Sequence, residues 1–206
     1  MSQFLLRLAF SVVGLGIAFA QADVAYNNFG LGIPFNSLLS YEISGPNSPD
    51  GDQSRAFQFT SATSGELVSI SFAASTLLSP GTLHIGLYAD SGDFVGTALA
   101  SLSIPISSGS PTIYTATSPP GVWLSAGQHY WVGQTADDDA SLAWYLASTG
   151  KKGRASYQFN SITPHYSTMT SFGAFRVETQ AVPEPGTFAA LGLGALGLTR
   201  RRKPHR

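Results

Sequence analysis

Residues 82–90 read TLHIGLYAD, and this short stretch sets the architecture expected of the whole chain. Leu83, Ile85 and Leu87 alternate with polar, glycine and aromatic residues. Successive side chains of a β-strand point to opposite faces of its sheet, so the three aliphatic side chains share one face. Antiparallel strands with one buried face and one solvated face show this pattern. The stretch therefore predicts a strand that packs one face on a hydrophobic core.

The same period of two recurs along the chain. Val68, Ile70 and Phe72 share a face in residues 66–75, and a pair of phenylalanines in RAFQFT repeats the pattern. Further candidate strands cover residues 98–104, 111–117, 128–136, 140–148 and 171–178. Clusters of Gly, Pro, Asp and Ser separate them, and amphipathic helical patterns are missing. The pattern predicts an all-β fold, an antiparallel β-sandwich of jelly-roll or Ig-like type, with a barrel as the alternative.

The composition narrows the class of protein. Charged residues make up only 11% of the 206 residues and aromatic residues 12%, a balance typical of exported β proteins. The chain has no cysteine, which excludes disulfides, cysteine-ligated metals and thiol nucleophiles. Between the two ends, acidic side chains are about twice as numerous as basic ones. Because nucleic-acid binding needs a basic face, we expect no nucleic-acid partner.

The N-terminal residues predict a secretory signal peptide. Arg7 precedes an apolar run of 13 residues, and Ala18, Ala20 and Ala22 fit small-x-small cleavage sites. The alternative is an N-terminal membrane anchor, but about 13 helical residues are too short for the ~30 Å hydrocarbon core of a bilayer. We therefore expect residues 1–22 to be removed during export, with Sec export machinery as a partner.

The C-terminal residues combine a short apolar run with a basic end. The run Thr187–Leu198 has 12 residues, which as a helix would cover only about 18 Å. Pro183 and Pro185 prevent such a helix from extending backwards, and three glycines lower its helix propensity. The basic side chains that follow favour the cytoplasmic side of a membrane. We expect short helical hydrophobic segments at both termini, the second inserting only transiently in the inner membrane.

The order of these C-terminal parts resembles the PEP-CTERM sorting signal. The resemblance is carried by the motif Val182, Pro183, Glu184 and Pro185 and by the basic stop Arg200, Arg201, Arg202 and Lys203. It implies an exported protein of a Gram-negative bacterium that makes extracellular polysaccharide. It also implies processing near the motif by exosortase, a membrane-embedded transpeptidase-like enzyme. The motif would then be the recognition element of a substrate, and the alternative is a membrane anchor that is never cut.

The chain thus divides into a signal peptide at 1–22, a β-sandwich domain at 23–180 and a sorting signal at 181–206. The middle part resembles the exported domain called choice-of-anchor R. The phrases that carry this resemblance are YNNFG at 26–30, SGPNSPDGDQSRAFQFT at 44–60, LHIGLYADSGDFVGTAL at 83–99 and GAFRVE at 173–178. The resemblance implies an exported β-rich module that occurs with several kinds of surface anchor, and it assigns no catalytic residue.

Aromatic residues provide the candidate binding site. Tyr130 and Trp131 are adjacent in one expected strand, as are Trp144 and Tyr145 in another, so one member of each pair must leave the interior. An outward ring can stack on the apolar face of a sugar, and Trp123 would add to such a surface. The alternative is that loops or the N-terminal segment cover the outward rings. The first reading predicts a partner among extracellular polysaccharides.

Acidic loops provide a candidate metal site. Asp90 and Asp93 fall in one expected loop, and Asp137, Asp138 and Asp139 fall in another. Calcium prefers several oxygen ligands, which loop carboxylates and carbonyls supply. Solvated turns are the alternative, because Asp and Gly are common turn residues. Apart from calcium, no cofactor is expected.

Catalytic signatures are missing from the sequence. It contains no Gly-x-Ser-x-Gly elbow, no His-Glu-x-x-His motif, no P-loop and no dinucleotide-binding glycine fingerprint. We therefore expect a non-enzymatic, structural or adhesive protein at the cell surface or in the extracellular matrix. The alternatives are a secreted carbohydrate-active enzyme and a matrix filler without a ligand.

Overall fold

A computed structural model describes residues 22–160 and 163–180 of the protein. The described residues form thirteen strands. They are β1 (Ala22–Asn27), β2 (Phe35–Ser44), β3 (Gln53–Thr60), β4 (Gly65–Ser79), β5 (Gly81–Asp90), β6 (Val95–Ile106), β7 (Thr112–Thr117), β8 (Trp123–Leu124), β9 (His129–Ala136), β10 (Ser141–Ala147), β11 (Lys152–Phe159), β12 (His165–Ser171) and β13 (Phe175–Gln180). Across residues 22–160 and 163–180, no helix has the length and apolar character needed to cross a membrane.

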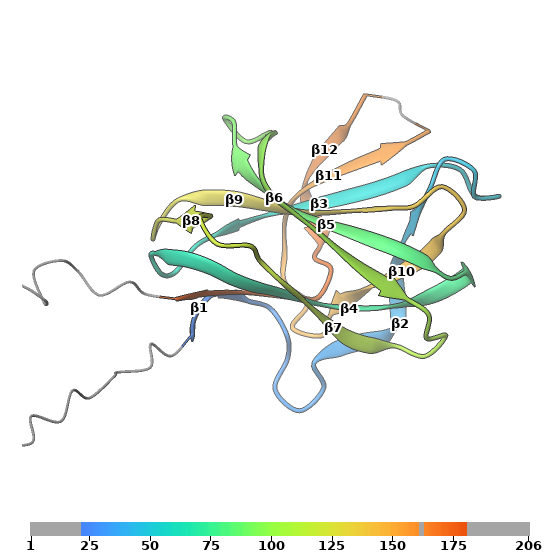
Figure 1. Cartoon of the computed structure of the whole chain (residues 1–206), viewed down its shortest axis with the longest axis horizontal. Helices are drawn as coiled ribbons and strands as arrows, with labels where there is room; N and C mark the ends of the chain where they lie inside the picture. Colours follow the sequence, from blue (N-terminus) through green and yellow to red (C-terminus); the bar gives the residue numbers. More distant parts are fainter. Residues whose placement is uncertain (1–21, 161–162, 181–206) are drawn as a thin grey trace, which may run out of the picture.

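The strands belong to one curled antiparallel sheet. Its main order is β1-β13-β4-β10-β2-β3-β9-β5-β6, with β11 added to β3, β12 added to β11, and β7 and β8 added to β4. Figure 1 shows β3, β9, β5 and β6 as one layer over another that contains β1, β4 and β7. We call these layers the first wall and the second wall, and β11 and β12 extend the first wall.

The expectation of an all-β antiparallel fold is confirmed, but the number of sheets differs from the expected two. The expected sandwich has two separate sheets, whereas here β2 and β10 join the two walls into a continuous sheet. The hydrophobic segments expected to be helical at the two termini lie outside the described residues. Ala22 pairs with Gln180, so the two ends of the described body lie side by side at one edge of the second wall.

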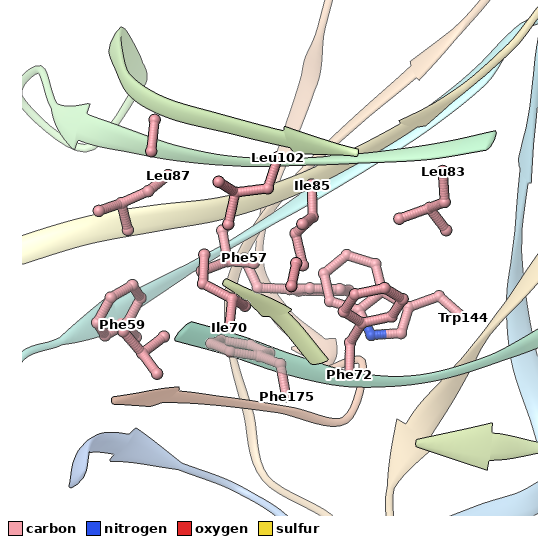
Figure 2. Close-up of a cluster of buried hydrophobic side chains, with 14 of the residues drawn as sticks. Phe57, Phe59, Ile70, Phe72, Leu83, Ile85, Leu87, Leu102, Trp144 and Phe175 are labelled. Atoms are coloured by element: carbon pink, nitrogen blue, oxygen red, sulfur yellow. The ribbon is translucent and has the colours of Figure 1, made fainter. Parts of the chain in front are cut away.

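The core fills the space between the walls, as the pattern at 82–90 predicts. Leu83, Ile85 and Leu87 of β5 have no exposed surface. Figure 2 shows their side chains in a buried cluster with those of Ile70, Phe72 and Phe175 from the second wall. Burial of apolar surface at about 25 cal/mol per Å² is the main stabilising term for such a body, which has no disulfides.

A β-bulge in β4 corrects one sequence expectation. The pairing of β4 with β13 shifts register between Glu178 and Thr179. An extra residue in one strand reverses the faces of the residues beyond it. Leu67 therefore enters the core, and Val68, which the alternation assigns to the same face as Ile70, is only partly buried.

Trp144 occupies the centre of the core. Its ring meets Phe57 edge to face, with ring centroids 4.9 Å apart. Its indole nitrogen donates a hydrogen bond to the carbonyl of Ala174 at 3.1 Å. A Cβ at Gly173 would overlap the indole, so this site requires glycine for close approach of the backbone.

We expect Trp144→Ala to lower the free energy of unfolding by about 3–5 kcal/mol, because it removes a fully buried ring and leaves a cavity. Urea denaturation would measure this loss. The matched control is Trp123→Ala, which removes a ring that is 53% exposed and should change stability by no more than about 0.5 kcal/mol. Equal losses for the two variants would contradict the assignment of Trp144 to the core.

Candidate functional site

In each of the two aromatic pairs, Tyr130–Trp131 and Trp144–Tyr145, the two side chains lie on opposite faces of the sheet, as expected. Tyr130 points into the core, where its ring lies 5.9 Å from that of Phe59, and Trp131 points to the outer face of the first wall. Trp144 lies in the core, and Tyr145 lies on the other face of its strand. The alternation of strand side chains is therefore correct for both pairs.

The outward members of both pairs are covered, which corrects the expectation of an open aromatic surface. Trp131 has no exposed surface because Tyr166 of β12 packs edge to face on its ring, with centroids 5.9 Å apart. Tyr145 is covered by Phe35, with ring centroids 5.6 Å apart. Of the five aromatic candidates, only Trp123 is exposed. The outward rings are therefore covered, as the alternative expected, but by residues of the strands β12 and β2 and not by loops.

Asp90 holds the covered Trp131 ring in place through a hydrogen bond. Its carboxylate accepts hydrogen bonds from the indole nitrogen of Trp131 at 2.7 Å and from the side-chain amide of Gln58 at 2.6 Å. Partial burial pushes the pKa of Asp90 upward, but these bonds and one from the backbone amide of Asp93 outweigh it, so the pKa lies below its usual range. Asp93 in turn forms an ion pair with Arg154 of β11 at 3.0 Å.

The second acidic loop is more exposed. Asp137 accepts a hydrogen bond from His84 at 2.7 Å, and bonds from Thr82 and then His84 hold its pKa below the usual range. Asp138 and Asp139 are exposed. Within residues 22–160 and 163–180, no three His, Cys, Asp or Glu side chains are grouped so that they could hold a metal ion. Calcium binding at either loop stays a prediction.

An open groove lies next to the covered tryptophan, on the outer face of the first wall. Its floor is a cross-strand row of small residues in which Ser156 pairs with Ala56, Ala56 with Gly133, and Gly133 with Gly86. Small side chains on four neighbouring strands leave a trough in a sheet face that larger residues would fill. The resulting cavity has a volume of about 290 Å³.

One side of this groove is aromatic. Tyr88 pairs with Trp131, and its ring lies over the glycine pair of the floor. A Cβ at Gly86 would overlap the ring, and one at Gly133 would come within 3.1 Å of it. Burial raises the pKa of Tyr88, in keeping with a ring held against the sheet. Val95 and Tyr166 continue this side.

The opposite side of the groove is polar and uncharged. Ser54, Thr135 and Gln158 occupy the neighbouring cross-strand row and line the cavity. In the part of the chain that the structure describes, the side chains of these three residues, of Ser156 and of Tyr88 make no hydrogen bond to protein. We call this site the Tyr88 groove. It offers an apolar ring on one side and free hydroxyl and amide groups on the other.

Sequence reasoning missed this groove because its parts are distant in the chain. Tyr88 and Gly86 belong to the stretch that predicts a strand, and Gly133 belongs to the strand of Trp131. Glycine inside a strand often marks a place where another group approaches the backbone closely. Gly86 and Gly133 therefore suggested a close approach to the backbone in each strand. The sequence alone does not show that the two glycines are paired on neighbouring strands.

The comparisons with known proteins concern the C-terminal end of the chain. A family model described as the PEP-CTERM protein-sorting motif matches residues 181–203. No curated protein matches the chain. The match includes the predicted Pro183, Glu184 and Pro185, and these residues lie outside the described part of the structure. The protein therefore carries an all-β domain followed by a PEP-CTERM motif, which implies exosortase processing, export and anchoring at the cell surface.

We expect Asp90→Ala to lower the free energy of unfolding by about 1 kcal/mol at pH 7. The carboxylate accepts several hydrogen bonds, and solvent screening at this partly exposed site reduces their effect. A folded-state pKa below the unfolded value of about 4 means that this stability is present above pH 4 and is lost as the pH falls through the folded pKa. The difference between variant and parent should therefore shrink in acid.

Urea denaturation at pH 7 and near pH 3, followed by tryptophan fluorescence, would measure this difference. Asp138→Ala is the matched control, since Asp138 is an exposed loop carboxylate and its loss should change stability little at either pH. A constant difference between Asp90→Ala and the parent across this range would contradict the role of the ionised carboxylate.

We expect replacement of Pro183, Glu184 and Pro185 by alanine to block processing, so that protein retaining residues 186–206 accumulates in the membrane fraction. Mass spectrometry of the C-terminal peptide, compared with that of the unaltered protein, would show this. Surface protein with the unaltered motif that still ended in GTFAALGLGALGLTRRRKPHR would argue against cleavage at the motif.

Proposed function

We propose that the protein is a non-catalytic adhesive or structural module that binds extracellular polysaccharide at the surface of a Gram-negative bacterium or in its matrix. The sorting motif at 181–203 supports a destination at the cell surface. In this proposal the middle domain is of the choice-of-anchor R type, a signal peptide and the Sec machinery export the chain, and the apolar C-terminal run enters the inner membrane only during processing.

The Tyr88 groove carries the proposal for binding. Sugars present an apolar C–H face and a rim of hydroxyl groups, and aromatic side chains with polar neighbours suit both. Tyr88 supplies the ring, and Ser54, Thr135 and Gln158 supply donors and acceptors that have no protein partner among the described residues. The groove replaces the predicted Trp131 and Trp144, whose rings have no exposed surface, as the binding surface.

The same groove favours a binding protein over an enzyme. Hydrolysis of a glycosidic bond by the usual route needs two carboxyl groups on either side of the bond. The described residues that line the groove include no Asp or Glu. A matrix filler without a ligand, the other alternative, has no need for a cavity edged by hydrogen-bonding groups.

We expect the exported protein, purified from producing cells, to be retained on beads that carry the extracellular polysaccharide of the same cells. Soluble polysaccharide should release it. Trp123→Ala should be retained equally, because β8 pairs with β4 of the second wall and the groove lies on the first. Passage of the unaltered protein without retention would remove polysaccharide binding and favour the filler.

A further inference from the structure

The charge of the Tyr88 groove limits what it can hold. Arg55 is the one charged residue among those described along the groove, and its guanidinium lies between the rings of Tyr41 and Tyr157, at 4.2 and 4.3 Å. Strand alternation places Arg55 on the inner face together with Phe57, away from the outward Ser54 and Ala56. The groove therefore presents no free charge to a ligand.

Two basic side chains on the outer face of the first wall already have carboxylate partners. Arg154 is held by Asp93 at 3.0 Å, and His84 is held by Asp137 at 2.7 Å. The domain as a whole is acidic, so it repels a polyanion at long range. A carboxylate or sulfate moved from water into this trough would lose hydration and gain no partner of opposite charge.

From this geometry we propose that the Tyr88 groove binds a short segment of an uncharged glycan, with the apolar face of one sugar unit stacked on the Tyr88 ring. The sugar hydroxyls then bond to the polar side formed by Ser54, Thr135 and Gln158. This inference rests on the proposed function, and it adds the chemical class of the ligand and the position of the contact.

The size of the cavity agrees with a short segment. Small-molecule sites usually enclose about 300–1,000 Å³. The groove, at about 290 Å³, lies at the lower limit of that range. The remainder of a polymer chain would continue over the surface, and affinity for a polymer would come from many weak contacts.

Affinity electrophoresis tests the proposal with the exported protein and three gels. One gel contains a neutral glucan, one contains a polyuronate, and one contains the polysaccharide of the producing cells. We expect the neutral glucan to retard the protein and the polyuronate to leave its mobility unchanged. Retardation by the polyuronate and by the cells' own polysaccharide, with none by the neutral glucan, would overturn the uncharged ligand and leave polysaccharide binding intact.

Variants test the position of the contact. Tyr88→Ala should weaken binding to the neutral glucan about tenfold, the loss usual for an aromatic anchor, and Tyr88→Phe should keep the ring and most of the affinity. Because Tyr88 also covers Gly86 and Gly133, melting temperature and near-UV circular dichroism must show that the alanine variant is folded.

A second variant keeps the test valid if Tyr88→Ala does not fold. Thr135→Ala with Gln158→Ala removes polar groups from the other side of the groove without touching the core, and we expect a several-fold loss of affinity. Trp123→Ala is the control outside the groove. Unchanged binding to the neutral glucan in both folded groove variants would overturn this site. No retardation in any of the three gels would overturn the proposed function as well.

Discussion

The structure depends on one constraint, which is that a regular strand places successive side chains on opposite faces, so that only one set can fill the core. In β5 this constraint buries Leu83, Ile85 and Leu87 and sends Tyr88 outward. In β9 it buries Tyr130 and sends Trp131 outward. Both outward rings arise on paired positions of neighbouring strands. The outer face of the first wall therefore carries large aromatic rings as a direct consequence of how its inner face is filled.

The two outward rings reach different environments because different segments lie above them. Tyr166 of β12 covers Trp131, and Asp90 satisfies the indole nitrogen beneath that cover. The ring of Tyr88 instead lies over Gly86 and Gly133, at one side of the Tyr88 groove, and the polar residues line the other side. Covering the larger ring stabilises the body. Leaving the smaller ring at the edge of a trough creates a surface that a ligand can reach.

The sequence predicted well what depends on neighbours along the chain and poorly what depends on pairing. Alternation at 82–90 was enough to identify a strand and its buried face. The bulge that places Leu67 in the core in place of Val68 arises from the pairing of β4 with β13. Because β13 lies more than 100 residues away in the chain, the sequence of β4 alone could not reveal the bulge. The burial of Trp131 and the meeting of Gly86 with Gly133 also require contacts between distant segments. The open side of the candidate site could not be derived without the register of four strands.

The position of the groove relative to the ends of the body fits attachment through the C-terminus. Ala22 and Gln180 are paired at the edge strands of the second wall, and the chain leaves β13 there toward the sorting motif. The Tyr88 groove lies on the outer face of the first wall, whose inner face is packed across the core from that edge. A tether at Gln180 therefore attaches to the second wall, across the core from the outer face of the first wall. An anchored protein of this topology can meet a glycan chain without turning over, because the core separates its attachment point from its candidate binding face.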